Sequence, residues 1–201
     1  MKTLKFEDRS EWLQARRGKV TGTRLKDIVV KRGTGEKMGF YELIAERLAV
    51  LPDDEIPMDR GIRLEEEAIE LFSKAEGKKV DTSLLMWTRD DNESIAVSPD
   101  GVIGQTEAVE CKCLSSALHI KSFLTKEIPD EYEFQTLQYF IVNDKLKVLH
   151  VVFYDPRFSE NLRMFVIKIN RKDVEEDIEE YMEIQRVKLA EVDRIVNELT
   201  F

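Results

Sequence analysis

The sequence predicts an α/β fold with a central mixed β-sheet flanked by helices. Three observations lead to this prediction. Apolar residues recur at helical spacing in several segments between residues 8 and 76. Short strand-like runs separated by turn residues follow, and the chain then continues as helix, strand, strand and helix. Because 201 residues are enough for one sizeable core, we expect a single domain over residues 1–201.

The N-terminal region is predicted to be helical. Asp8 to Val30 alternates charged and apolar residues at helical spacing, with breaks at Gly18 and at Thr21 to Thr23. We therefore expect a short helix, a turn, and a second helix that starts near Thr23. A threonine at a helix start can cap the helix or help to hold a phosphate, because the first N–H groups are unpaired. The elements expected next are a loop at Gly33 to Gly35, a helix at Phe40 to Leu48 and a loop at Pro52 to Pro57.

An amphipathic helix is predicted over Gly61 to Glu76, where apolar residues share one side and Glu65 to Glu67 lie among them. The strand-like runs after it are Leu84 to Trp87, Ile95 to Val97, Val102 to Ile103 and Ala108 to Cys113. The remaining expected elements are a helix at Glu131 to Asn143, strands at Val148 to Tyr154 and Met164 to Ile169, and a long acidic surface helix at Asp173 to Leu199.

The composition is that of a soluble globular protein, with 42% hydrophobic and 35% charged residues. No apolar stretch approaches the roughly 20 residues that a membrane span needs. The polar segment Met1 to Lys5 lacks the apolar core of a signal peptide. We therefore expect a cytoplasmic protein without a membrane partner.

The net charge of −9 argues against a nucleic-acid partner, but the charge is unevenly distributed. Residues 1–39 hold eleven Lys or Arg against five Asp or Glu, whereas residues 171–201 hold five against ten. Because phosphate attraction depends on local potential, a basic N-terminal region can bind DNA while the acidic end stays in solvent.

Cysteine, histidine and tryptophan residues suggest no site of their own. Cys111 and Cys113 are one residue apart, which suits neither a disulfide framework nor a four-thiolate metal site, so we expect small apolar strand residues. His119 and His150 belong to different elements, which argues against a histidine metal site. We expect both tryptophans, Trp12 and Trp87, in the core.

The segment with chemical content is Ser98-Pro99-Asp100-Gly101, followed by Glu110-Cys111-Lys112. In a strand, residues two apart point to the same face, so Glu110 and Lys112 would both face Asp100 from the preceding turn. Asp100, Glu110 and the backbone carbonyl of Cys111 suit Mg²⁺, which prefers oxygen ligands. Lys112 would orient the attacking water or offset negative charge that develops on a phosphodiester.

This motif also has a plain structural interpretation, in which Glu110 and Lys112 form a solvated strand face and Asp100 is a turn residue after proline. Its setting favours the site: a turn between two short strands, the apolar flank Ala108-Val109, and an acidic helix upstream.

Five separate elements, in order, resemble the phage lambda exonuclease-like recombination nucleases, also called YqaJ-type viral recombinases, of the PD-(D/E)xK superfamily. They are the segment Trp12 to Thr23, Gly61 to Glu65, Ser98 to Lys112 with its two motifs, Tyr132 to Tyr139, and Tyr154 to Arg157. The resemblance implies a restriction-endonuclease-like core. It also implies a processive 5′-to-3′ exonuclease on double-stranded DNA ends, which leaves a 3′ single strand for annealing-type recombination.

The resemblance implies two Mg²⁺ ions, replaceable by Mn²⁺, held by Asp100, Glu110 and the carbonyl of Cys111. Lys112 matches the catalytic lysine of the family. Glu65 matches the helix glutamate placed near metal-bound water, and Gln135 matches the helix glutamine, although Gln138 is an alternative three residues later.

Arg16 and Thr23 match the residues that hold the 5′-phosphate, with Thr23 in place of a frequent serine. Asp90 matches a further acid by spacing, with Asp91 as the alternative, and Tyr132 is expected to support the site from behind. The resemblance further implies a ring-shaped homotrimer, a single-strand annealing protein as partner, and the cytoplasm of a bacterial host if the chain is phage or prophage encoded.

Two other readings of the same residues stay open. The catalytic core does not decide whether cleavage needs a DNA end, so a structure-specific or site-specific endonuclease is an alternative. A DNA-end-binding protein without chemistry is the second, although Asp100, Glu110 and Lys112 are all present.

Overall fold

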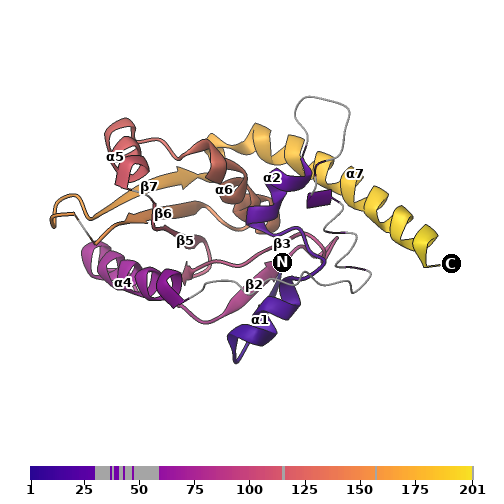
Figure 1. Ribbon diagram of the computed structural model, residues 1–201, viewed down its shortest axis with the longest axis horizontal. Coiled ribbons are helices and arrows are strands. Elements are labelled where there is room, and N and C mark those ends of the chain that lie inside the picture. The colour runs from indigo at the N-terminus through magenta and orange to yellow at the C-terminus, as the bar shows by residue number, and fades with distance from the viewer. Residues whose placement is uncertain are drawn as a thin grey trace.

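Two β-sheets form the framework of the computed structural model, and the chain passes directly from the last strand of the first sheet to the first strand of the second (Figure 1). The first sheet has the antiparallel order β1–β2–β3, and the second has the order β4–β5–β6–β7. In the second sheet β5 and β6 are parallel while both outer pairs are antiparallel, so the sheet is mixed. The strands are β1 (Lys2–Lys5), β2 (Leu85–Thr88), β3 (Ala96–Val97), β4 (Gly101–Ile103), β5 (Glu107–Lys112), β6 (Val148–Tyr154) and β7 (Met164–Asn170).

The structure describes residues 1–29, 37, 39, 40, 43, 47, 59–114, 116–156 and 158–200. The loops expected at Gly33 to Gly35 and Pro52 to Pro57 lie outside these residues, as do most of the helix expected at Phe40 to Leu48 and Arg157. The described helices are α1 (Arg9–Arg16), the 3₁₀ turn η1 (Gly22–Arg24), α2 (Leu25–Ile28), α4 (Asp59–Glu76), α5 (Ser116–Thr125), α6 (Asp130–Val142), η2 (Arg171–Asp173) and α7 (Glu175–Leu199).

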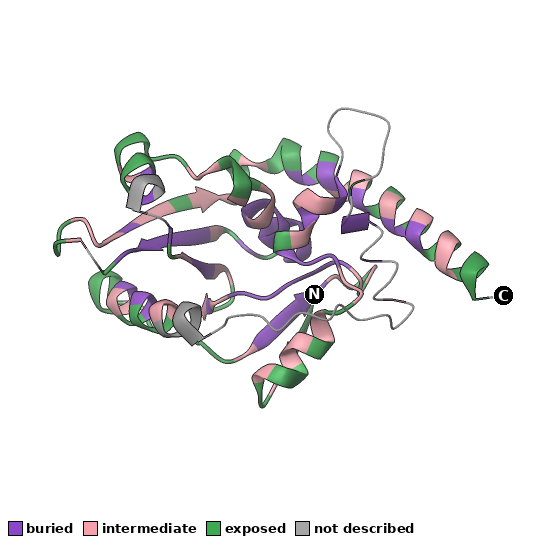
Figure 2. Ribbon diagram, viewed as in Figure 1, coloured by how far each residue is buried: buried purple, intermediate pink, exposed green. Residues whose placement is uncertain are grey.

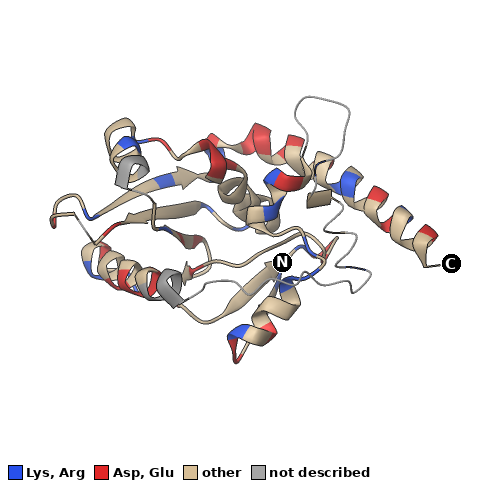
Figure 3. Cartoon of the chain, in the orientation of Figure 1, with Lys and Arg blue, Asp and Glu red and all other residues tan. Residues whose placement is uncertain are grey.

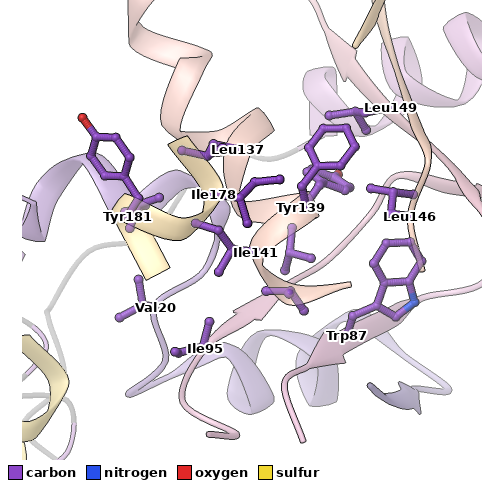
Figure 4. Close-up of a cluster of buried hydrophobic side chains, with 14 of the residues drawn as sticks. Val20, Trp87, Ile95, Leu137, Tyr139, Ile141, Leu146, Leu149, Ile178 and Tyr181 are labelled. Carbon is purple, nitrogen blue, oxygen red and sulfur yellow. The ribbon is translucent and has the colours of Figure 1, made fainter. Parts of the chain in front are cut away.

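Helices cover both faces of the second sheet because its central strands alternate apolar residues to the two sides. Val109 and Cys111 of β5 pack with Ala68 and Phe72 of α4 on one face. Ala108 of β5 belongs to the larger core on the other face, together with α6 and α7 (Figure 2). Side chains of this larger core from the N-terminal segment, the first sheet, α6 and α7 meet in Figure 4. The predicted arrangement of a mixed sheet flanked by helices is therefore present.

A buried pair of glutamines joins α6 to three other segments. Gln138 donates from Nε2 to the carbonyl of Val20 at 2.9 Å, and the same atom lies 3.3 Å from the carbonyl of Ala96. Gln138 and Gln185 of α7 exchange amide hydrogen bonds of 2.9 and 3.1 Å. Both glutamines are fully buried, so these bonds fix how α6 sits between the first sheet and α7.

Among the described residues, the sequence pattern did not predict strand β1 or helix α5. All four residues of β1 are exposed on the sheet edge, so the strand has no apolar alternation to reveal it. In α5 the fully described buried positions are His119 and Ser122, so polar residues occupy part of the inner face. No helix in the described part of the chain is long and apolar enough to cross a membrane.

Candidate active site

Asp100 lies where the chain passes from one sheet to the other, because only Ser98, Pro99 and Asp100 separate β3 from β4. Its Oδ2 accepts a hydrogen bond of 2.7 Å from the backbone N–H of Cys111 on β5. Gly101 follows because a Cβ there would come 2.4 Å from Cγ1 of Val80, so no other residue fits this turn without a shift. The Pro-Asp-Gly turn thus places the carboxylate of Asp100 against the backbone of Cys111, between Glu110 and Lys112.

Glu110 is a buried carboxylate held by three donors. Its Oε1 accepts hydrogen bonds from Lys112 Nζ at 2.6 Å and from Gln135 Nε2, and its Oε2 accepts one from the hydroxyl of Tyr139. Glu110 is 3% exposed, and burial of a carboxylate is tolerated when charged or polar donors surround it. Two oxygens offer about four lone-pair sites, so one site on Oε2 remains available for a further ligand.

Lys112 is the central donor of the cluster. Its ammonium bonds Oε1 of Glu110 and Oε1 of Gln135, the latter at 2.8 Å, and it lies 4.6 Å from the ring centre of Tyr132. Burial lowers the pKa of Lys112, but the neighbouring Glu110 and Asp100 outweigh it and raise the pKa overall. Lys112 is therefore a charged residue beside two carboxylates, as a group that stabilises negative charge must be.

Glu65 reaches the same cluster from the first part of α4. It is half-buried, whereas the adjacent Glu66 and Glu67 are exposed. Burial and then the charge of Glu110 raise the pKa of Glu65. Burial, Glu110 and Glu65 likewise raise the pKa of Asp100 well above its usual value. Glu65 and Asp100 thus both lie near Glu110, whose charge raises the pKa of each, while Lys112 acts in the opposite direction.

Arg16, at the end of α1, also lies within electrostatic reach of the cluster. Burial lowers the pKa of Arg16, while Glu110, Tyr139 and Asp100 oppose that effect. Its guanidinium carbon lies 4.4 Å from the ring centre of Trp12. The expectation that Trp12 is a core residue is wrong: α1 buries none of its residues, and the indole ring contacts guanidinium groups instead.

Thr23 is exposed in η1, 3.5 Å between hydroxyl oxygens from the buried Thr21. The helical segment begins as expected at this point, but its N-cap is Thr21, whose side chain makes no capping hydrogen bond. The segment adjoins the cluster through Gly22, where a Cβ would come 3.0 Å from Cγ of Gln135. Thr23 is thus next to the cluster but contacts none of its carboxylates in the described structure.

Asp90 is not part of the cluster. It is exposed and forms an ion pair with the N-terminal ammonium of Met1. The alternative, Asp91, pairs with Arg89 at 2.7 Å. The turn after β2 therefore directs both acids away from Asp100, and spacing along the chain misplaced them.

Tyr139 is the residue that the sequence analysis missed. Tyr132, Gln135 and Tyr139 are spaced by three and four residues, so one face of α6 presents all three to Lys112 and Glu110. Gln138 points elsewhere and is used in the buried glutamine pair. Once the family resemblance indicates Gln135, helical periodicity could have identified Tyr139, because a residue four positions later lies on the same face of a helix.

The donor set fits a hard divalent cation in part. Among the described residues no three His, Cys, Asp or Glu side chains are grouped closely enough to form a metal site by themselves. Asp100 and Glu110 offer two carboxylates whose repulsion a cation would relieve, and Glu110 keeps a free lone-pair site. Because Mg²⁺ usually takes one or two carboxylates and completes its shell with water and phosphate oxygens, this set suits it.

The chain is similar to known nucleases over most of its length. A family model described as the YqaJ-like viral recombinase domain matches residues 11–145. The structure resembles an alkaline exonuclease, LHK-Exo, from Laribacter hongkongensis, with a TM-score of 0.80, 26% identity, and coverage of 95% of this chain and 96% of that one. A complex of LHK-Exo with dAMP matches with a TM-score of 0.77 and 26% identity over 95% of this chain and 98% of that one.

A phage-related exonuclease from Haemophilus somnus shares the fold, with a TM-score of 0.63, 15% identity, and coverage of 90% of this chain and 96% of that one. A comparison with curated protein sequences found no match. The match to LHK-Exo confirms the predicted fold class, and the matched residues 11–145 include the motifs from Trp12 to Tyr139.

Proposed function

The chain belongs to the YqaJ-like viral recombinase domain family, and on this premise we propose that it is a metal-dependent 5′-to-3′ exonuclease acting on double-stranded DNA ends. The similarity to an alkaline exonuclease over nearly the whole of both chains supports a nuclease. The known dAMP complex of that enzyme supports a deoxynucleotide product.

One observation carries the proposal: Asp100, Glu110, Lys112 and Gln135 come together from separate segments in a single hydrogen-bonded cluster. A solvated strand face would leave Glu110 and Lys112 free to water. Glu110 is instead 3% exposed and held by three donors, and burying a carboxylate costs free energy unless the charge has a use. This argues for the site and against the plain structural interpretation of the motif.

Asp100, Glu110 and the carbonyl of Cys111 would hold Mg²⁺, two ions in our proposal, with Mn²⁺ able to replace it. When bound, the metal supplies Lewis-acid activation of the phosphodiester and of water. The chain's own residues do the rest of the work. Gln135 and Tyr139 hold Glu110 in one orientation, and the ammonium of Lys112 offsets charge that develops on the phosphate. Glu65, at the edge of the cluster, positions water.

Arg16 and Thr23 are proposed to hold the terminal 5′-phosphate. Arg16 lies close enough to Asp100 and Glu110 for both to influence its pKa, and its guanidinium has no anionic partner in the described part of the chain. A guanidinium binds a phosphate through two parallel hydrogen bonds. The proposal predicts faster digestion of 5′-phosphorylated ends than of 5′-hydroxyl ends, and equal rates would contradict it.

Processive action is proposed to come from a ring-shaped homotrimer that encircles DNA and works beside a single-strand annealing protein. Light scattering on the purified protein tests the trimer, and a monomer in solution would contradict it. Carboxylates gather at the start of α6 and of α7, away from the proposed DNA-binding α1 (Figure 3).

The decisive experiment measures nucleotide release from linear, 5′-phosphorylated duplex DNA with Mg²⁺. The wild type is compared with Lys112→Ala and with the matched surface variant Lys145→Ala, and a closed circular duplex serves as second substrate. We expect digestion of the linear DNA by the wild type and Lys145→Ala, none by Lys112→Ala, and no cleavage of the circle.

Each other result selects an alternative. Nicking of the circle would favour a structure-specific or site-specific endonuclease with the same core. Binding of DNA ends without metal-dependent hydrolysis would favour a non-catalytic DNA-end-binding protein. Full activity of Lys112→Ala would remove the catalytic role of Lys112.

A further inference from the structure

The guanidinium groups of two arginines lie against the indole ring of Trp12 in α1. The guanidinium carbon of Arg9 lies 5.0 Å from the centre of the indole ring, and that of Arg16 lies 4.4 Å from it. Both distances lie within the range of about 6 Å in which a ring attracts a cation. Residues 9 and 16 are two helical turns apart with residue 12 between them, so one side of α1 presents the whole arrangement.

Neither arginine has an anionic partner among the described residues. Within the residues that the structure describes, the side chains of Arg9 and Arg16 form no hydrogen bond and no ion pair, and their charges repel each other. The Nε–H of Arg9 is enclosed by the chain and has no hydrogen-bond acceptor in the described ranges. A buried donor without an acceptor costs free energy, so this group fits a ligand that brings an acceptor with it.

Both guanidinium groups lie within electrostatic reach of the carboxylate cluster, but each acts on different carboxylates. The charge of Arg9 acts on Glu65, whereas Arg16 is influenced by Glu110 and Asp100. Arg16 is thus nearer to the reacting centre, and Arg9 lies on the side of Glu65. Two cations on one aromatic ring suit a ligand with more than one negative group along its length.

We propose that Arg9 is a second phosphate-binding residue, which takes an internal backbone phosphate of the degraded strand while Arg16 takes the terminal one. Trp12 holds the two guanidinium groups at a fixed spacing, so the DNA strand is bound at its terminal phosphate and at one internal phosphate. This inference rests on the proposed function in taking DNA as the ligand. It adds a residue that none of the motifs of the family resemblance includes.

The test is equilibrium binding of a fluorescent 5′-phosphorylated duplex with Ca²⁺ in place of Mg²⁺, followed by anisotropy across a range of salt concentrations. Arg9→Gln is compared with the wild type and with Arg17→Gln, which removes the same charge at the C-cap of the same helix; Arg17 contacts no aromatic ring among the described residues. We expect Arg9→Gln to weaken binding about tenfold and to reduce the slope of log K against log salt by about 0.9.

A second comparison locates the phosphate. A single neutral methylphosphonate is placed at each of the first internal linkages in turn. At one linkage it should weaken wild-type binding about as much as Arg9→Gln does, while Arg9→Gln itself becomes insensitive to it. Arg9→Gln should keep the preference for 5′-phosphorylated over 5′-hydroxyl DNA, which Arg16→Gln should lose.

Several results would overturn the inference. Equal losses in Arg9→Gln and Arg17→Gln would indicate a general charge effect, and loss of the 5′-phosphate preference in Arg9→Gln would place Arg9 at the terminal phosphate. If Arg9→Gln melts below the wild type, Arg9→Lys decides: it should keep the salt slope and lose part of the affinity, and unchanged affinity would refute a forked contact. A wild type that binds no DNA would instead remove the proposed function itself.

Discussion

Replacing Tyr139 with phenylalanine would remove one of the three donors of Glu110 and little else. The ring of Tyr139 is fully buried and meets Trp87 edge-on, with centroids 6.3 Å apart and planes at 86°. Phenylalanine preserves this packing because its ring has the same shape. The hydroxyl donates to Oε2 of Glu110, so the substitution leaves that oxygen without a protein donor.

The size of the effect follows from the charge of the acceptor. A hydrogen bond to a charged group contributes about 1.5 to 3 kcal/mol. For a chain of this length each kcal/mol shifts Tm by about 2 to 4 °C, so Tyr139→Phe should melt about 3 to 12 °C below the wild type. If the same free energy is lost from the arrangement that the reaction needs, the rate falls about ten- to a hundredfold.

Thr136→Val is the matched control for this substitution. Thr136 is buried on the same helix, and its hydroxyl donates to the carbonyl of Glu133 at 2.8 Å. The lost bond has a neutral acceptor and contributes about 0.5 to 1.5 kcal/mol, so Tm should fall less and the rate should not change.

Thermal unfolding by circular dichroism and nucleotide release at saturating DNA measure the two effects. If Tyr139→Phe keeps both the wild-type Tm and the wild-type rate, Glu110 does not depend on this hydroxyl. If Thr136→Val loses activity equally, the loss comes from disturbing α6 and the reasoning about Glu110 fails.

Three further predictions follow from the described contacts. Gln135→Leu removes a donor of Glu110, so it should lower both the rate and Tm, whereas Gln138→Leu should lower the free energy of unfolding by about 1 to 3 kcal/mol, because it leaves buried partners unsatisfied; an unchanged rate in Gln135→Leu would contradict the role of Gln135 at the site. Gly22→Ala should reduce nucleotide release on the order of tenfold by displacing Gln135, and an unchanged rate would show that α6 accommodates the methyl group. Burial lowers the pKa of His150 despite its 2.6 Å contact with Glu107, so the neutral ring is the stable folded form. Its contribution is complete above the unfolded pKa of about 6.5 and is lost as pH falls below that value, so Tm should decline from pH 7 to 5 more steeply in the wild type than in His150→Gln; parallel curves would contradict this.

The strand motif was predictable because its logic is local. Alternation along a strand places Glu110 and Lys112 on one face, and the Pro99-Asp100-Gly101 turn precedes the strand in the chain. For these residues short-range geometry and the site coincide, and the sequence suffices.

Other parts of the site depend on contacts that no local pattern contains. Gln135 and Gln138 lie on neighbouring faces of α6, and only the packing against Val20 and α7 decides which one turns inward. The position of Trp12 was wrong because a tryptophan usually joins the core, whereas α1 lies at the rim and buries nothing. Asp90 matched the family's acid by its spacing along the chain, but in the structure it pairs with the N-terminal ammonium of Met1 instead of joining the site.

The buried glutamine pair has a consequence for how stability and activity are related. Apolar packing alone allows a helix to rotate slightly about its own axis at little cost, whereas paired amides match in one rotation only. Gln138 and Gln185 therefore set the angle at which α6 points Gln135 and Tyr139 towards Glu110. Apolar replacement of the whole pair could leave the protein as stable as before and still make it a poorer catalyst. In this chain the orientation of the site depends on the least apolar part of its core.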